Sequence, residues 1–284
     1  MNTRPLAFLD AASRETLPGR PALIGLPFDG TCTYRMGAAD APRAIREVSD
    51  SIETYSPLLD MDLEDSPFAD LGDLEFTERA HADVESILRT IELAATDIES
   101  RGAKILAVGG EHTITLPIVR VLAKTRPDLL VVHLDAHTDL RDHYEGNRFS
   151  HATVMRRVYD VLGPGRLVQL GIRAGTREEF RWMRDQNTIL NWGENGAEDL
   201  RARIGSRPVY LTLDLDVLDP ACLPGTGNPE PGGWFYKDLE RLLVTLGSAD
   251  LIGADVVELN PGLDPSQASS VTAAKIVREL LLIL

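Results

Sequence analysis

Histidines and acidic residues recur in three short segments, at spacings that suit a metal centre. The six residues are His112, Asp135, His137, Asp139, Asp214 and Asp216. In an extended chain, side chains two residues apart point to the same side. Asp135, His137 and Asp139 can therefore converge on one point, and so can Asp214 and Asp216. Two glycines before Glu111 allow a sharp turn that presents His112 to the same region.

The charge of this set predicts two bound cations. Four carboxylates in one cleft of low dielectric constant repel one another, and each raises its neighbours' pKa unless cations offset the charge. One divalent ion would leave net negative charge and unused ligands, whereas two ions bridged by two carboxylates fit the set. Carboxylate and imidazole ligands without thiolate favour Mn²⁺, with zinc, cobalt or nickel as alternatives.

Each segment also has a simpler interpretation when it is taken alone. The residues before His112 can form a strand-to-helix turn in which Glu111 complements the helix dipole. Asp214 and Asp216 can be loop carboxylates or helix caps, and Glu258 can pair with an arginine. Three ionisable groups directly after a buried strand are costly unless they are used, so the segment from Asp135 to Asp139 is the strongest of the set.

Short apolar runs alternate with amphipathic stretches along the chain, and they predict the elements that position these residues. The predicted strands are 22–26, 104–108, 129–134, 167–172, 209–215 and 251–259. The predicted helices are 82–100, 117–124, 153–162, 177–186, 197–204, 237–246 and 270–283. This alternation predicts an α/β fold with three αβα layers, a mostly parallel central sheet and a single domain over 1–284. Such sheets bind ligands at the carboxyl ends of their strands, where the polar segments lie.

Composition narrows the class of protein and its partners. The 284 residues are 43% hydrophobic and 26% charged, with a formal net charge of −15. This acidic balance argues against nucleic acid and anionic membranes as partners. Two cysteines without a CxxC pair argue against a disulfide framework and against a thiol-metal site. The sequence shows neither a signal-peptide pattern nor an apolar run long enough to span a bilayer. The expected location is the cytoplasm.

The motifs resemble those of the ureohydrolase family, which contains arginases and agmatinases. They read GGEHT at 109–113, DAHTD at 135–139, DLDVLDP at 214–220 and PGTGNPEPGG at 224–233. The resemblance extends from residue 27 to residue 261, and the fold it implies is the one shared by arginases and deacetylases. The family often has aspartate where this chain has Glu111, but that position is not a family metal ligand. We therefore expect little consequence of the difference.

The resemblance implies a role for each site residue. One Mn²⁺ would be held by His112, Asp135, Asp139 and Asp214, and the other by His137, Asp135, Asp214 and Asp216. Asp135 and Asp214 would bridge the two ions. The ions would share one water and lower its pKa enough to supply hydroxide near neutral pH. Asp139 would also relay a proton to the leaving amine.

Four further residues complete the expected site or lie beside it. Glu258 would hold the substrate guanidinium, and Asn228 in the segment 224–233 is a candidate for substrate binding. His151 would exchange protons with solvent, although a helix-start histidine is the alternative. His133 matches no family ligand and is predicted to be a core histidine.

The expected substrate is a small cationic guanidino compound, agmatine, which would be cleaved to putrescine and urea. Arginases tend to have aspartate where this chain has Ala174 and Thr176. Asp142 and Glu145 can receive the distal ammonium or can be solvated loop charges. Aminopropylagmatine, guanidinobutyrate and arginine remain alternatives, as do a single-zinc deacetylase and a non-catalytic family member. The family also implies a homo-oligomer, a trimer or hexamer.

Overall fold

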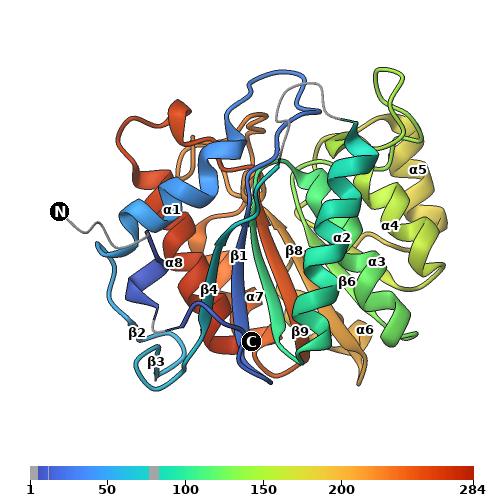
Figure 1. Ribbon diagram of the computed structural model, residues 1–284. Helices are drawn as coiled ribbons and strands as arrows, with labels where there is room; N and C mark the ends of the chain where they lie inside the picture. The colour runs from blue at the N-terminus through green and yellow to red at the C-terminus, as the bar shows by residue number, and fades with distance from the viewer. Residues whose placement is uncertain (1–5, 12, 77–82) are drawn as a thin grey trace.

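A seven-stranded sheet forms the centre of the computed structural model, which describes residues 6–11, 13–76 and 83–284. The strand order is β4-β1-β5-β9-β8-β6-β7, and every pairing within this sheet is parallel. The strands are β1 (Pro21–Leu26), β4 (Ala69–Asp73), β5 (Lys104–Gly109), β6 (Leu130–Leu134), β7 (Leu167–Leu170), β8 (Pro208–Asp214) and β9 (Asp250–Val257). The predicted parallel sheet is confirmed (Figure 1).

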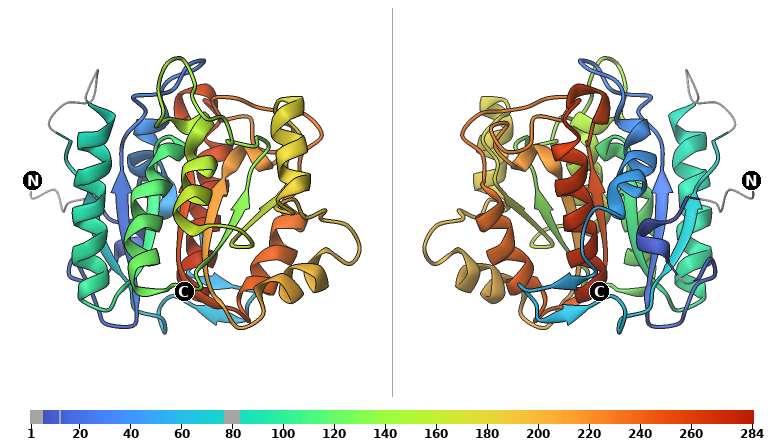
Figure 2. Two further views of the ribbon diagram at one scale, coloured as in Figure 1. Left: turned by 90° about the vertical axis from the view of Figure 1, so that its right-hand side faces the viewer. Right: turned by 90° about the vertical axis from the view of Figure 1, so that its left-hand side faces the viewer.

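Helices cover both faces of this sheet. They are α1 (Ala41–Ser49), α2 (Val84–Ser100), α3 (Thr115–Thr125), α4 (Val154–Leu162), α5 (Arg177–Asp185), α6 (Gly196–Ile204), α7 (Tyr236–Leu246) and α8 (Ala268–Ile283). One apolar core lies under α2, α3 and α4, and a second lies under α1, α6, α7 and α8. Figure 2 shows the two helical layers on opposite sides of the strands. The predicted three-layer fold is confirmed.

Burial on both faces explains why the central strands read as apolar runs. Every residue of β1 and of β6 is buried, and one of them, His133, is polar. Strands covered by helices on both faces must be apolar almost throughout, because neither face reaches water. Within the described ranges, no helix combines the length and apolar composition that a membrane span requires.

Two predicted strands end earlier than expected, for backbone reasons. The strand predicted over 251–259 ends at Val257, because Glu258 has a φ of 67° and leaves the extended conformation. The strand predicted over 167–172 ends at Leu170, because Gly171 has a φ of 83°. The helix predicted from residue 82 begins at Val84, where Asp83 caps it, and residue 82 itself lies outside the described residues.

Some elements have no counterpart in the prediction. Edge strand β4 has the sequence ADLGD, which lacks an apolar run, and α1 carries a proline in its first turn. A small antiparallel pair, β2 (Tyr55–Ser56) and β3 (Met61–Asp62), was also not predicted. None of these elements carries a predicted site residue.

Candidate metal centre

Four adjacent strands deliver the site residues to one edge of the sheet. In the order β5-β9-β8-β6, the chain leaving each carboxyl end carries His112, Glu258, Asp214 and Asp135 respectively. His112 begins a 3-10 turn, His112–Ile114, that leads into α3. The sheet thus gathers residues that are as far apart as 146 positions in the sequence, as the backbone contact of His112 with Glu258 shows.

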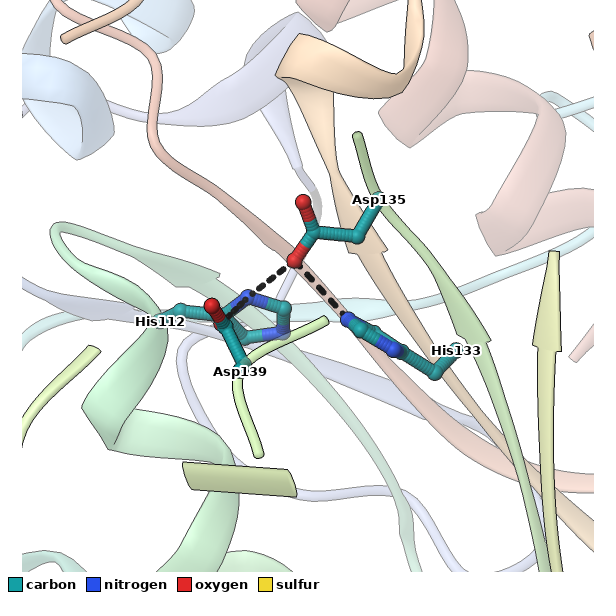
Figure 3. Close-up of side chains that lie close together, drawn as sticks. All are labelled: His112, His133, Asp135 and Asp139. Carbon is teal, nitrogen blue, oxygen red and sulfur yellow. Dashed lines mark hydrogen bonds and ion pairs between the residues drawn. The ribbon is translucent and has the colours of Figure 1, made fainter. Parts of the chain in front are cut away.

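A first group of side chains surrounds His112. Its Nδ1 lies 3.2 Å from Asp135 Oδ2, 3.2 Å from Asp139 Oδ2 and 3.3 Å from Asp214 Oδ2. The imidazole and all three carboxylates are buried. Figure 3 shows the rings of His112 and His133 on either side of the Asp135 carboxylate, with Asp139 beside His112.

The hydrogen-bond partner of His112 Nε2 determines which ring nitrogen carries the hydrogen when the ring is neutral. Nε2 lies 2.8 Å from Thr212 Oγ1, whose only hydroxyl hydrogen goes to Asp255 Oδ1 at 2.6 Å. Thr212 therefore accepts from Nε2–H, and in the neutral ring Nδ1 keeps a lone pair. Nδ1 has no hydrogen-bond partner among the described residues. A buried lone pair aimed at three carboxylate oxygens fits a cation between them.

A second group adjoins the first and shares Asp135 with it. His137 Nδ1 lies 2.9 Å from Asp216 Oδ2 and 3.4 Å from Asp135 Oδ1. Their ligand atoms, like those of His112, Asp135 and Asp139 in the first group, lie close enough together to hold a metal ion. The structure therefore brings together all six residues that the sequence proposes as ligands. Their oxygen and imidazole atoms suit divalent cations such as Mn²⁺.

The pKa values of the group reflect its surplus of negative charge. Burial and the charges of Asp216 and Asp135 raise the pKa of Asp214 well above its usual range. Burial and Asp135 likewise raise the pKa of Asp139 to about 7. Although burial disfavours the imidazolium, the carboxylates of Asp216 and Asp135 raise the pKa of His137 to about 12. The carboxylates therefore bind positive charge strongly, whether as protons or as metal ions.

Two site residues adopt a backbone conformation that is uncommon for residues other than glycine. Asp139 has a φ of 53° and Glu258 a φ of 67°, both in the left-handed region. The carbonyl of Asp139 accepts the N–H groups of Met155 and Arg156 at the start of α4. Glu258 N–H donates to Gly110 O at 2.8 Å. These bonds hold both carboxylates in place despite the strained backbone.

An open cavity of about 310 Å³ leads to this centre. The predicted substrate residues Glu258, His151 and Asn228 line it, together with Asp139, Asp214 and Asp216. Glu258 Oε1 accepts the N–H of His112 at 2.8 Å, so Oε2 is the oxygen available to a ligand. Burial and the nearby Glu111 raise the pKa of Glu258 to about 8, and a cation bound beside it would favour the charged carboxylate.

His151 lies at the wall of the cavity as a half-buried side chain. Its ring packs edge-on against Tyr144, with the ring centroids 5.6 Å apart. Burial lowers the pKa of His151 to about 4, so the ring is neutral at pH 7. Asp142 is not among the residues that line the cavity, and its carboxylate pairs with Arg157 Nη2 at 2.6 Å. Glu145 lines a neighbouring hollow instead.

A group of residues behind the cavity wall was not predicted from the sequence. The buried carboxylate of Glu111 accepts hydrogen bonds from the hydroxyls of Thr31 and Thr113, and from Thr31 N–H at 2.6 Å. The Thr31 hydroxyl oxygen in turn accepts His151 N–H at 3.3 Å. Glu111 therefore anchors the loop that carries His151. Nothing in the sequence links these residues, because Thr31 lies 80 positions before Glu111.

Comparisons with known proteins agree with this geometry. The family model described as the arginase family matches residues 20–283. An agmatinase from Bacillus anthracis is 40% identical over 92% of this chain and 90% of its own length. A guanidinobutyrase from Pseudomonas aeruginosa is 35% identical over 93% of this chain and 86% of its own length. The crystal structure of agmatine ureohydrolase from Thermoplasma volcanium matches with a TM-score of 0.87 and 34% identity, covering 99% of this chain and 95% of that one. The resemblance drawn from the motifs is thus confirmed, and the chain belongs to the arginase family.

Proposed function

We propose that this protein hydrolyses agmatine to putrescine and urea with two Mn²⁺ ions. One ion would be held by His112, Asp135, Asp139 and Asp214, and the other by His137, Asp135, Asp214 and Asp216. The observation that carries the proposal is the buried Nδ1 of His112, which has no hydrogen-bond partner among the described residues and lies within 3.3 Å of three carboxylates, beside a cavity that Glu258 lines.

In the reaction, water adds to the guanidino carbon and the bond from that carbon to the chain nitrogen breaks. Two bound cations would supply Lewis acidity and would lower the pKa of a water toward neutral pH. Glu258 binds the guanidinium through Oε2, because Oε1 is already held by His112 N–H. A charge-assisted hydrogen bond of this kind fixes the plane of the guanidinium and presents its carbon for attack.

The departing amine must gain a proton, and two residues can move it. Asp139 lines the cavity and can pass a proton to the chain nitrogen. His151 is neutral at pH 7, lines the same cavity and can exchange protons with solvent. The hydrogen bond from His151 N–H to the Thr31 hydroxyl oxygen holds this residue at the cavity wall.

Two observations support agmatine as the substrate. The relative from Bacillus anthracis is named an agmatinase, and the relative from Thermoplasma volcanium is named an agmatine ureohydrolase. Ala174 and Thr176 line the cavity where arginases tend to have aspartates that recognise an amino acid. Agmatine lacks the carboxylate of arginine and needs no such recognition.

One observation favours a second substrate, guanidinobutyrate. Arg141 lines the cavity, and its guanidinium lies over the ring of Tyr144, 4.7 Å from the centroid. A cation in this position would attract a carboxylate at the far end of a substrate and repel an ammonium. The relative from Pseudomonas aeruginosa is a guanidinobutyrase.

Urea release from a panel of guanidino compounds, with Mn²⁺ present, tests the proposal. The panel contains agmatine, aminopropylagmatine, guanidinobutyrate and arginine, and kcat/KM is compared across it. The proposal expects the highest value for agmatine. The highest value for guanidinobutyrate, lost in Arg141→Leu but kept in the control Arg148→Leu, would establish the second substrate. Release of urea from none of the four, with metal bound, would overturn the ureohydrolase function.

We further propose that the whole chain is one folding unit and that it forms a homo-oligomer, a trimer or hexamer, in the cytoplasm. A single cooperative unfolding transition would support the first point. Sedimentation velocity would determine the number of subunits. A purely monomeric protein at micromolar concentration would contradict the second point.

A further inference from the structure

His133 lies behind the metal centre, in the middle of a strand. It belongs to β6, its side chain is fully buried, and its Cα pairs in register with that of Gln169 on β7. Its Nε2 lies 2.9 Å from Asp135 Oδ2, and its Nδ1 lies 3.1 Å from Gln169 Nε2 (Figure 3 shows the contact with Asp135). The ring thus stands between a proposed metal ligand and an amide of the neighbouring strand.

The surroundings of Gln169 determine which way its amide points. Its Nε2 lies 2.9 Å from the backbone carbonyl of Thr138, which can only accept a hydrogen bond. On the other side, Oε1 accepts the hydroxyl hydrogen of Thr188 at 2.9 Å. The amide nitrogen therefore faces Thr138 and His133, and the amide oxygen faces Thr188.

This orientation determines the tautomer of His133. Because Gln169 donates to Nδ1, that nitrogen carries no hydrogen, and the hydrogen of the ring is on Nε2. Nε2–H then donates to Asp135 Oδ2. An Nε2 that carries hydrogen has no lone pair for a metal. His133 is therefore not a metal ligand, although one of its ring nitrogens lies within 4.8 Å of ligand atoms of His112, Asp135 and Asp139.

The hydrogen bond from His133 leaves Asp135 suited to bridge two ions. Each carboxylate oxygen offers about two lone pairs. On Oδ1, one of these is used by His137 N–H at 2.5 Å, and on Oδ2 one is used by His133 Nε2–H at 2.9 Å. One lone pair remains on each oxygen, which allows Asp135 to give one bond to each of two cations.

We propose that Thr188, Gln169 and His133 form a hydrogen-bonded relay that orients Asp135 and thereby sets the affinity of the dinuclear site. In this relay His133 is a positioning residue. The inference rests on the metal-dependent function proposed above but not on the identity of the substrate. Hydrogen-bond partners behind a metal ligand commonly change metal affinity by about 10- to 100-fold.

Two amide variants of His133 separate positioning from simple packing. The side chain of asparagine reaches the place of Nδ1, so His133→Asn can keep the contact with Gln169 but not the one with Asp135. The longer side chain of glutamine reaches the place of Nε2, so His133→Gln can restore the donor to Asp135. Both variants place an amide in the same buried position. His143→Gln, at a histidine whose side chain is 56% exposed, is the control.

The experiment is a Mn²⁺ titration of the metal-free protein, followed by electron paramagnetic resonance, which detects free Mn²⁺ and the coupled pair separately. We expect His133→Asn to weaken Mn²⁺ binding by about 10- to 100-fold and to lose the coupled signal. His133→Gln should bind within a few-fold of the wild type. Equal binding by wild type and His133→Asn, or equal losses in both variants, would overturn the relay.

Thr188→Val provides a second measurement if a His133 variant fails to fold. It removes one end of the relay without touching Asp135, and it should weaken Mn²⁺ binding in the same direction. Wild-type affinity in this variant would also contradict the proposal. A wild type that binds two Mn²⁺ but releases no urea would overturn the proposed function and leave the relay result intact. A wild type that binds no Mn²⁺ would overturn both.

Discussion

Replacing Glu258 with glutamine should impair substrate binding more than the loss of one charge would suggest. In the wild type, Glu258 Oε1 accepts His112 N–H at 2.8 Å. A glutamine at this position must turn its only oxygen toward that N–H, because its nitrogen cannot accept. The amide nitrogen, a donor, would then face the guanidinium, which is itself a donor only.

The expected loss follows from these contacts. The variant forfeits a hydrogen bond between charged groups, which is worth about 1.5–3 kcal/mol, and gains a contact between two donors. A total of about 2–4 kcal/mol corresponds to a fall in kcat/KM of about 30- to 1000-fold. The bound metal should be unchanged, because Glu258 is not among the proposed ligands.

Steady-state urea release and metal analysis of the same protein samples test this reasoning. Glu178→Gln, at an exposed position of α5, is the matched control and should behave as wild type. An unchanged kcat/KM in Glu258→Gln would remove Glu258 from guanidinium binding. Loss of metal together with activity would show that the effect arises from collapse of the centre and would refute the proposed role.

Three further changes test other parts of the structure. Asp135→Ala removes the proposed bridge between the ions, so metal analysis should find fewer than two Mn²⁺ ions per subunit and urea release should be abolished. Robust turnover would contradict this role. Thr212→Val removes the acceptor of His112 Nε2–H, so calorimetry should show Mn²⁺ binding weakened by about 10- to 100-fold. Asp70→Asn removes the charge of one of the two carboxylates that pair with the buried Arg46, whose Nε and Nη2 each lie 2.9 Å from Asp70, and should lower the free energy of unfolding by about 1.5–3 kcal/mol. Despite burial, the hydrogen bonds from Arg46 lower the pKa of Asp70, so the stabilisation is present above the unfolded-state pKa of about 3.9 and is lost as pH falls through the lower folded value. Urea unfolding should therefore show a smaller difference between the two proteins at pH 3 than at pH 7.

The central strands and the proposed ligands were predictable for one physical reason. Strands buried on both faces are apolar, so the polar residues that follow them stand out. Asp135 follows β6, and Asp214 ends β8 after a run of buried residues. The ends of neighbouring parallel strands then meet at one edge without further information.

Other features depend on contacts that no local pattern reveals. Strand β4 is held partly by the ion pair between its buried Asp70 and Arg46 of α1. A charged residue at a buried strand position interrupts the apolar run by which a strand is normally recognised. His133 was correctly predicted to be buried, but its bond to Asp135 becomes meaningful only when the register with Gln169 is known. Such partners lie on separate strands and are brought together only by the tertiary fold.

The left-handed backbone at Asp139 and Glu258 lowers the stability of the fold at two positions whose carboxylates the proposed reaction needs. A residue with a β-carbon in this conformation costs about 1–2 kcal/mol, a cost that glycine avoids. Asp139→Gly would relieve this strain and also remove one of the crowded carboxylates, at the expense of the proposed chemistry. In a lineage released from selection for turnover, position 139 would therefore be among the first to drift, and glycine or asparagine there would mark descendants that kept the fold after losing the reaction.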